Sequence, residues 1–331
     1  MTRTTAIFFL FALLFLVIFA LRREEAPSPL TRTQMLMGTV VEIRVLDDGA
    51  GRYRQAVSAA FAEMLRIEKL MSPHLPESDI SRISAATKPV EVSAETLEVL
   101  QTALLVAAAS DGAFDAGLGR LIRLWGFAEG EPALPSADAI TLALEGVGPN
   151  SLKIEADKIH KLFPRLAVDL GGVAKGYAID RAIDILAAAG IKHATVNAGG
   201  DMRLLGDRSG SLWRIGIQHP RQPGQILASL NLADRAVVTS GDYERTFEQE
   251  GVRYHHILDP RSGYPAAGCQ SVTVVARKAA YADAMATAVF VLGPERGLFL
   301  LQNSPRAEGM IVAADGSVKV STGLQEVIVW P

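Results

Sequence analysis

Cysteine is nearly absent from this chain of 331 residues, since Cys269 is the only one. A single thiol excludes an internal disulfide, even in an oxidising compartment, and it excludes a cysteine-based metal site. No cysteine follows the amino-terminal apolar run, so attachment through a lipid-modified cysteine is excluded too. We interpret Cys269 as a small half-buried residue beside a strand, the common role of a lone cysteine.

Long runs of basic residues are also absent. The chain has 33 Lys and Arg against 36 Asp and Glu, a formal net charge of -3, so neither DNA nor RNA is an expected partner. With 49% hydrophobic and 21% charged residues, its composition is that of an ordinary globular protein. Any site for an anion must therefore be built locally.

Two familiar phosphate-binding patterns are missing as well. Neither G-x-G-x-x-G nor G-x-x-x-x-G-K-[ST] can be written through the glycine-rich stretch 168–177. This stretch nevertheless combines an acid, glycines and a lysine where a short buried strand, 166–170, is expected to turn into a helix that Gly190 ends. The N–H groups and the dipole of a helix N-terminus favour an anion such as phosphate. The alternative is that Gly171 and Gly172 only allow tight packing of strand on helix.

An uninterrupted apolar run covers residues 6–21, with Arg3 before it and Arg22 and Arg23 after it. This pattern predicts an export signal. The 16 residues lie between the apolar region of a signal peptide and a full membrane span, and no small-x-small cleavage site follows at once, which favours an uncleaved anchor. We therefore divide the chain into a signal peptide or membrane anchor (1–21), a linker (22–33) and one folded domain (34–331).

The folded part mixes helices and strands without regular βαβ alternation, which favours an α+β fold over a doubly wound sheet. Helical spacing of apolar residues predicts long helices at 52–71, 94–110 and 280–292, in addition to the helix after the glycine-rich stretch. Alternating or short apolar runs predict strands at 41–45, 194–196, 213–217, 226–232, 253–258 and 271–276.

Two histidines, His255 and His256, are neighbours in the strand expected at 253–258. Successive side chains of a strand point to opposite faces, so only one of them can line a given site. Neither has a cysteine or a second histidine at metal-ligand spacing. A structural, hydrogen-bonded role is the alternative for each.

Asp283 and Thr287 lie four residues apart in the helix expected at 280–292, and hence on one face of it. Both offer oxygen to a hard cation such as Mg²⁺. Two oxygens do not complete its shell, so backbone carbonyls, water or a ligand phosphate must supply the rest. The alternative is an acid that serves the helix dipole and a threonine that bonds to its own backbone.

Taken together, seven stretches of the chain resemble the ApbE-type FAD:protein FMN transferases, bacterial flavin transferases of the cell envelope. These stretches are 37–39, 111–115 with 124–127, 168–177, 197–201, 239–245, 256–263 and 282–287. Each is weak alone, but their order, spacing and residue types agree from Met37 to the end of the chain. The resemblance implies an α+β fold of antiparallel-rich sheets with packed helices, preceded by the membrane or signal segment.

The resemblance also implies that FAD binds in an extended form, with a Mg²⁺ ion near its pyrophosphate. The ion is expected on the backbone carbonyl of Gly172 and on the side chains of Asp283 and Thr287. The positions that match FAD contacts of the family are Met37, Ala113, Phe114, Asp115, Asp169, Lys175 and Ile257.

The reaction that the resemblance implies is protein flavinylation, in which FMN passes from FAD to a Ser or Thr hydroxyl of an acceptor protein and AMP is released. The hydroxyl attacks the FMN-side phosphorus, while magnesium and the charge of Lys175 offset the negative charge of the phosphates. We expect His256, which matches the family's histidine, to be the base, because the unperturbed pKa of histidine lies near working pH.

The expected acceptors are exported flavoproteins, such as subunits of respiratory NADH:quinone reductase-type complexes. The expected location is the periplasmic side of the bacterial inner membrane, with the amino-terminal segment in the membrane. Two alternatives remain. One is an enzyme that hydrolyses FAD to FMN and AMP, with water in place of the hydroxyl. The other is a periplasmic FAD-binding protein without catalysis, against which the metal pair argues.

Overall fold

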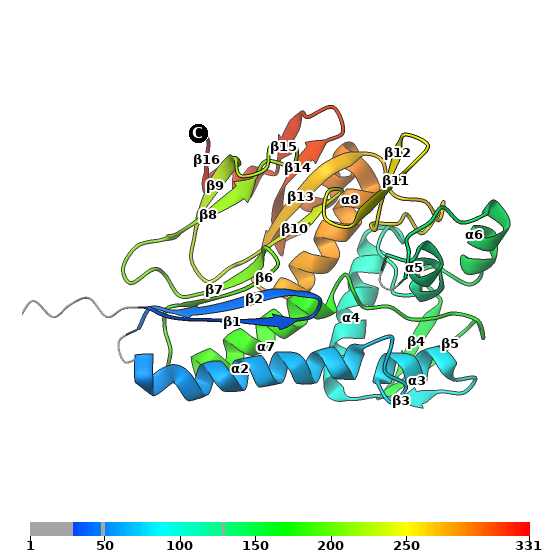
Figure 1. Ribbon diagram of the computed structural model, residues 1–331, viewed down its shortest axis with the longest axis horizontal. Coiled ribbons are helices and arrows are strands. Elements are labelled where there is room, and N and C mark those ends of the chain that lie inside the picture. The colour runs from blue at the N-terminus through cyan, green and yellow to red at the C-terminus, as the bar shows by residue number, and fades with distance from the viewer. Residues whose placement is uncertain (1–28, 48–49, 128–129) are drawn as a thin grey trace, which may run out of the picture.

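The computed structural model of the chain describes residues 29–47, 50–127 and 130–331. An eight-stranded sheet runs through the molecule in the order β1-β2-β6-β7-β10-β13-β14-β15 (Figure 1). Its strands are β1 (Leu30–Leu36), β2 (Thr39–Val45), β6 (Ala194–Ala198), β7 (Asp201–Leu205), β10 (Ala236–Gly241), β13 (Cys269–Ala276), β14 (Ala307–Ala313) and β15 (Val318–Val320). All neighbouring strands are antiparallel, which confirms the α+β class with antiparallel-rich sheets.

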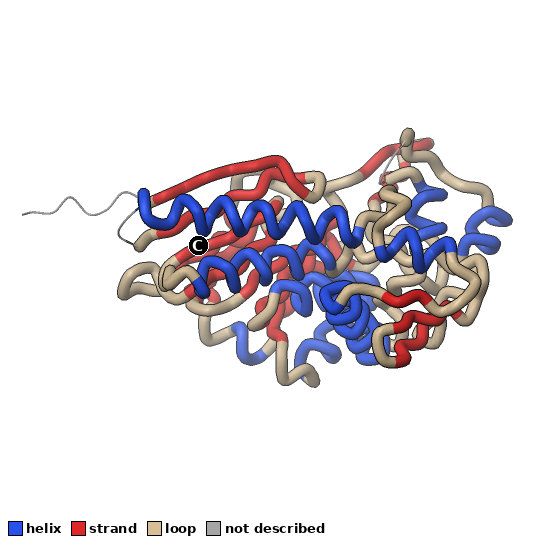
Figure 2. Tube along the Cα trace, turned by 90° about the horizontal axis from the view of Figure 1, so that it is seen from below, coloured by secondary structure: helices blue, strands red, loops and turns tan. Residues whose placement is uncertain are grey.

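Three long helices cover one face of this sheet: α2 (Ala50–Met71), α7 (Ala174–Ala188) and α8 (Ala279–Gln302). Helix α2 packs on β1 and α7, helix α7 on β6, β7 and α8, and helix α8 on β10, β13 and β14. Figure 2 shows α2 and α7 side by side across the strands. Helix α4 (Ala94–Ala109), capped by Ser93, packs against α8.

A second, smaller apolar core lies on the opposite face of the sheet. A three-stranded sheet of β8 (Trp213–Gln218), β9 (Ile226–Leu232) and β16 (Ile328–Val329) covers it. Its buried Trp213 and Leu230 belong to one cluster with Val237 and Val275 of the large sheet. The central strands are thus covered on both faces, and β13 is buried at every position.

The remaining elements are short and lie outside the large sheet and its three covering helices. Three of them are helices, α3 (Asp79–Ala85), α5 (Gly119–Trp125) and α6 (Ala137–Ala143), and one is the 3₁₀ turn η1 (Thr322–Leu324). A three-stranded sheet consists of β3 (Val90–Glu91), β5 (Lys158–Lys161) and β4 (Leu152–Glu155), and a hairpin consists of β11 (Thr246–Gln249) and β12 (Val252–His255). Trp125 contacts Phe247 and Tyr254 of that hairpin, and its indole N–H donates to the Gly263 carbonyl at 2.9 Å. These contacts fix the hairpin that leads to His256.

Within the described residues, α8 is the one helix long and apolar enough to cross a membrane. It is nevertheless a core helix, because it packs on α4, α7 and three strands. Its helical geometry is interrupted at Gly293, where φ is 79° and ψ is 177°, and Pro294 follows. This break is where the sequence predicted the helix to end.

Two predicted boundaries are wrong. Strand β1 begins at Leu30, inside the range 22–33 expected to be a linker, because its hydrogen bonds come from pairing with β2. The strand expected at 253–258 ends at His255. The amino-terminal segment 1–21, expected to be a signal or an anchor, lies outside the described residues.

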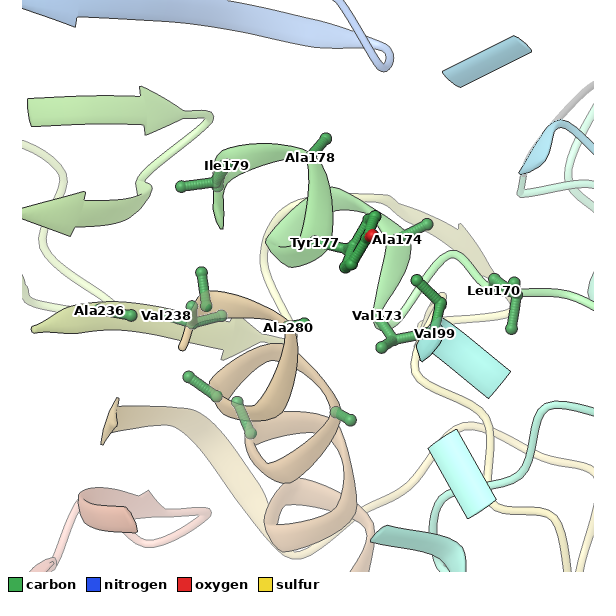
Figure 3. Packing of buried hydrophobic residues seen from close by; sticks show 14 of the residues in the cluster. Val99, Leu170, Val173, Ala174, Tyr177, Ala178, Ile179, Ala236, Val238 and Ala280 are labelled. Carbon is green, nitrogen blue, oxygen red and sulfur yellow. The ribbon is translucent and has the colours of Figure 1, made fainter. Parts of the chain in front are cut away.

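The strand expected at 166–170 is also wrong. This segment joins no sheet and makes one isolated bridge, between Leu118 and Ala167, while the Asp169 N–H donates to the Ala116 carbonyl at 2.8 Å. A short apolar run indicates burial more surely than it indicates a strand. Leu170 and Val173 are indeed buried near Val99 of α4, beside the first turn of α7 (Figure 3).

Candidate active site

The glycine-rich turn before α7 lies against the middle of α8. Asp169 Oδ1 accepts the Gly171 N–H at 2.8 Å, which fixes the turn. A Cβ atom at Gly172 would lie 3.0 Å from Phe114 Cε2 and 3.4 Å from Thr287 Oγ1. Three of the expected site residues, which are far apart in the sequence, are therefore neighbours in space.

The carbonyl of Gly172 has no backbone partner in the described part of the chain. In a regular helix the Gly176 N–H would donate to it, but this N–H donates to Asp283 Oδ2 at 3.1 Å. No other backbone N–H within the described residues donates to the Gly172 carbonyl. A backbone oxygen beside Thr287 is therefore available to a ligand.

Asp283 and Thr287 both lie on the part of α8 that contacts the glycine turn. Asp283 is buried, and its Oδ1 accepts no hydrogen bond from the described part of the chain. Burial raises the pKa of Asp283, and the positive charge of Lys175 opposes that shift. Thr287 Oγ1 lies 3.5 Å from the Ser240 hydroxyl oxygen of β10. The Asp283 carboxylate and the Thr287 hydroxyl thus lie on the same part of α8 that contacts the glycine turn.

Lys175 is fixed next to this group by an ion pair with the buried Asp201. Asp201 is the first residue of β7, and its Oδ1 also accepts the Thr239 N–H at 3.0 Å. Burial acts to lower the pKa of Lys175, but the carboxylates of Asp201 and Asp283 outweigh this and raise it above its usual range. Lys175 is therefore positively charged at every physiological pH.

Ala113, Phe114 and Asp115 form a buried loop after α4. The Phe114 N–H donates to Ser110 Oγ at 3.2 Å, and Asp115 Oδ1 accepts the Gly117 N–H at 2.6 Å. Asp115 Oδ2 is buried without a hydrogen-bond partner within the described residues, and burial raises the pKa of this carboxyl. An unpaired buried oxygen costs free energy, so a polar ligand group that reaches it would be stabilised.

Met37 and Gly38 form the hairpin turn between β1 and β2. Both have positive φ, 53° and 70°, as a tight two-residue hairpin turn requires. The Met37 N–H donates to Glu68 Oε1 at 2.8 Å, and a Cβ at Gly38 would lie 3.4 Å from Arg245 Nη2. The turn thus lies next to Arg245. Burial raises the pKa of Asp169 and lowers the pKa of His256; the charge of Arg245 opposes the first shift and adds to the second.

The neighbours His255 and His256 have different environments, although only His255 lies in a strand. His255 is buried, its Nε2 is 2.8 Å from the Ala266 carbonyl oxygen, and its Nδ1 accepts the Ile257 N–H at 3.2 Å. Nδ1 of His256 is buried with no hydrogen-bond partner among the described residues. His255 is therefore structural, and His256 retains a free ring nitrogen.

His256 does not keep the unperturbed pKa of histidine, on which its choice as the base was argued. Burial lowers this pKa to about 4, and the charges of Arg245 and Lys175 act in the same direction. Residue type cannot reveal this desolvation. The imidazole is consequently neutral at pH 7, which is the form that can accept a proton.

Ile257 follows His256 with its side chain buried. Its N–H donates to His255, and its carbonyl accepts the Ala266 N–H at 3.0 Å. Its N–H is therefore already used, and its carbonyl oxygen has one lone pair left for a further hydrogen bond.

Three polar residues at this site received no role from the sequence: Ser240, Asp201 and Arg245. Each lies inside a stretch that carries the family resemblance, 197–201 or 239–245. Serine, aspartate and arginine are common on protein surfaces, so residue type does not reveal a role for these three. The burial of Asp201 and the position of Arg245 beside Gly38, which only the structure shows, indicate their importance.

Within the described residues there is no cluster of three or more His, Cys, Asp or Glu side chains that could hold a metal ion. A metal at this site would instead use Asp283 with the neutral oxygens of Thr287 and Gly172. All three are hard oxygen donors, the kind that Mg²⁺ prefers, and Mg²⁺ usually completes its shell with water and phosphate. The residues present therefore fit Mg²⁺.

Two cavities lie away from these residues. One, of about 600 Å³, is bordered by α4, α7 and the start of α8, and its lining includes neither Gly172 nor Asp283. The other, of about 400 Å³, is lined by His255 rather than His256, together with Arg221, Asp242 and Cys269. Burial raises the pKa of Cys269 to about 12, so its thiol stays protonated and inert, in line with the structural role predicted for it.

Comparison with known proteins gives a consistent result. A family model described as the ApbE family matches residues 37–311. Two proteins named FAD:protein FMN transferase, from Treponema pallidum and Vibrio cholerae, are 32% and 34% identical to this chain; the alignments cover 89% and 86% of it and 87% of each relative. The crystal structure of the ApbE protein from Thermotoga maritima matches with a TM-score of 0.84 at 35% identity, over 91% of this chain and 99% of that one. The structure of the flavin transferase ApbE from Vibrio cholerae matches with a TM-score of 0.80 at 30% identity, over 91% and 99% of the two chains.

Proposed function

The chain belongs to the ApbE family, and from this we propose that it is a Mg²⁺-dependent FAD:protein FMN transferase that attaches FMN to a Ser or Thr hydroxyl of an acceptor protein and releases AMP. The observation on which the proposal rests is the oxygen group formed by the Gly172 carbonyl, Asp283 and Thr287, with Lys175 beside it. A site of this kind suits a pyrophosphate, which brings negative charge and its own oxygen ligands.

Mg²⁺ would be held by Asp283, Thr287 and the Gly172 carbonyl. When bound, it supplies positive charge that offsets the charge on the pyrophosphate oxygens. Asp283 is buried beside Lys175, and burial raises its pKa. A cation at this place favours the ionised carboxylate, because an opposite charge nearby lowers the pKa of an acid.

The transfer step needs a base and a fixed positive charge. The acceptor hydroxyl oxygen forms a bond to the FMN-side phosphorus, the bond from that phosphorus to the oxygen of AMP breaks, and the hydroxyl proton passes to a base. His256 is the proposed base, because its Nδ1 is unpaired and its ring is neutral at pH 7. The phosphates of FAD would raise its low pKa, since negative charge favours imidazolium. Lys175 keeps its positive charge during the whole reaction. This charge stabilises the transition state, in which the phosphorus is partly bonded to both the attacking and the leaving oxygen.

The products formed with and without an acceptor test the proposal. Purified protein is incubated with FAD and Mg²⁺, alone or with a candidate acceptor domain, and FMN, AMP and FAD are separated by chromatography. We expect AMP to appear with the acceptor present, matched by protein-bound FMN. Free FMN and AMP formed equally well without acceptor would indicate FAD hydrolysis, and unchanged FAD in both samples would indicate a binding protein.

We further propose that the acceptors are exported flavoproteins, such as subunits of respiratory NADH:quinone reductase-type complexes, and that the enzyme works on the periplasmic side of the bacterial inner membrane. The apolar run at 6–21 supports this location. Fusion of residues 1–33 to alkaline phosphatase, which is active only outside the cytoplasm, tests it. An active, membrane-associated fusion is expected, and an inactive one would contradict the export of the chain.

A further inference from the structure

The cavity of about 600 Å³ lies apart from the residues assigned to flavin transfer. Its wall includes one face of α7, with Tyr177, Arg181 and Asp184 at helical spacing, and the first turn of α8 with Tyr281. The ends of β10, β13 and β14 close it on the remaining side. Cavities of this volume are typical of sites for small ligands.

A row of three arginines borders this cavity. Ala236 of β10 pairs with Ala276 of β13, which pairs in turn with Ala307 of β14. Arg235, Arg277 and Arg306 each lie one residue beyond these alanines, at the same end of three adjacent strands, and all three line the cavity. Like charges at facing positions of neighbouring strands are destabilising, so the row has no advantage for the fold.

None of these arginines has an acidic partner among the described residues. The only side-chain hydrogen bond of the three is from Arg235 to the carbonyl of its neighbour Asp234, at 3.1 Å. The acidic groups around the cavity are engaged elsewhere. Glu98 accepts the Tyr177 hydroxyl at 3.0 Å, and Asp184 lies 3.5 Å from Lys278 and 3.8 Å from Arg181.

The two other acids of the wall are also occupied. Asp180 accepts the N–H groups of Ala279 and Ala280 and pairs with Arg203 at 2.8 Å. Glu308 accepts hydrogen bonds from Ser321 and Gly323. The three guanidinium groups of the row thus make no ion pair within the described residues, and they remain available to an anion from outside.

The rest of the wall is suited to an apolar ring. Leu105, Ala280 and Pro305 line it together with the rings of Tyr177 and Tyr281. We propose that this cavity is a second ligand site, which binds a phosphate monoester of an aromatic compound, with the phosphate on the arginine row and the ring against the tyrosine side. A guanidinium group can donate two parallel hydrogen bonds to two oxygens of one phosphate. A doubly charged phosphate monoester can therefore pair with more of the three arginines than a carboxylate can.

Isothermal titration calorimetry of the purified full chain tests this inference, with AMP, FMN and inorganic phosphate as separate probes. The double variant Arg277→Gln/Arg306→Gln removes two members of the row. Arg214→Gln, at an exposed position of β8 outside the cavity, is the matched control. FAD affinity is measured for all three proteins as a readout of the flavin site.

We expect AMP or FMN to bind the wild type and the control equally, and the double variant at least tenfold more weakly, with unchanged FAD affinity. The tighter of the two esters then identifies whether an adenine or a flavin ring fits the cavity. Equal ester affinity in the double variant would overturn the inference, as would a parallel loss of FAD affinity. Inorganic phosphate that binds as tightly as the esters would contradict the role of the apolar wall. Because no transfer activity is measured, the result is independent of the proposed enzyme function.

Discussion

At the scale of single residues, His255 and His256 illustrate how two neighbouring, identical side chains can have different environments. His255 has both ring nitrogens bonded to backbone groups, whereas Nδ1 of His256 has no partner among the described residues. A buried polar atom without a partner costs free energy and persists where a ligand uses it. This difference, which residue type cannot show, supports His256 rather than His255 as the proposed base.

Replacing His256 by alanine should therefore abolish transfer and leave FAD binding intact. We expect the rate of FMN transfer to fall by about 10²–10⁴-fold, the usual contribution of a general base, while fluorescence titration gives an unchanged FAD affinity. His160→Ala on the distant strand β5 is the control and should keep wild-type activity. Full transfer by His256→Ala would refute the role of this residue.

The low pKa of His256 also predicts a dependence of stability on pH. Its pKa is about 4 in the native state against a usual value of 6.5. Between these values the unfolded chain binds a proton that the native chain does not, so the free energy of unfolding falls as pH drops from about 6.5 to about 4 and then levels off. The shift corresponds to at most about 3 kcal/mol.

Urea unfolding of the wild type and of His256→Gln at pH 4 to 7 measures this effect. The neutral amide should remove part of the loss of stability at acid pH. Equal slopes of unfolding free energy against pH in the two proteins would show that His256 is not the desolvated group.

At the scale of elements, the contact between α7 and α8 decides the geometry of the site. A Cβ at Gly176 would overlap the Ala279 carbonyl oxygen and lie 2.7 Å from the Ala280 nitrogen. Glycine at this position lets the two helices approach at backbone distance. The same approach allows the Gly176 N–H to reach Asp283, which leaves the Gly172 carbonyl free.

Gly176→Ala should consequently separate the two helices. We expect a loss of about 1–3 kcal/mol in the free energy of unfolding, as for other overpacked sites, together with weaker Mn²⁺ binding measured by electron paramagnetic resonance. Gly51→Ala in α2 is the matched control, because a Cβ there would meet nothing within 4 Å. That helical substitution should be neutral or stabilising. Wild-type stability of Gly176→Ala would contradict the close approach.

Asp180 joins α7 to the first turn of α8. Its two oxygens accept the N–H groups of Ala279 and Ala280 at 2.9 and 3.1 Å, and Arg203 of β7 pairs with it. In Asp180→Asn the amide NH₂ would face one of these donors, so we expect a loss of about 1–3 kcal/mol in unfolding free energy. Asp184→Asn, at a more exposed ion pair, should cost less than about 1 kcal/mol. Equal losses in chemical denaturation would contradict the capping role.

At the scale of the whole molecule, periodicity predicted the parts that depend on local pattern. The helices α2, α4 and α7 follow from apolar spacing, and the structure confirms them. The position of Gly293 predicted the break in α8 for the same reason. These features are determined by residues close together in the sequence.

Features that depend on distant partners were not predictable in this way. Strands β1, β7 and β14 obtain their hydrogen bonds from other strands, and residues 166–170 are buried without joining a sheet. The candidate site was found largely through the resemblance of seven stretches to one family, because Gly172, Asp283 and Thr287 are common residue types that become a site only in the folded chain. Asp201 and Arg245 were missed, since their burial and position appear only in three dimensions.

The most direct test of the central claim is the intact mass of an acceptor protein after incubation with FAD at increasing Mg²⁺ concentrations. With the wild-type chain we predict the addition of one FMN per acceptor, which EDTA abolishes. Asp283→Asn should require at least tenfold more Mg²⁺ for the same rate of addition, because it loses the one charged ligand of the proposed metal site. FMN addition at the same rate in EDTA, or the same Mg²⁺ dependence in Asp283→Asn, would contradict a transfer site built from the glycine turn and α8.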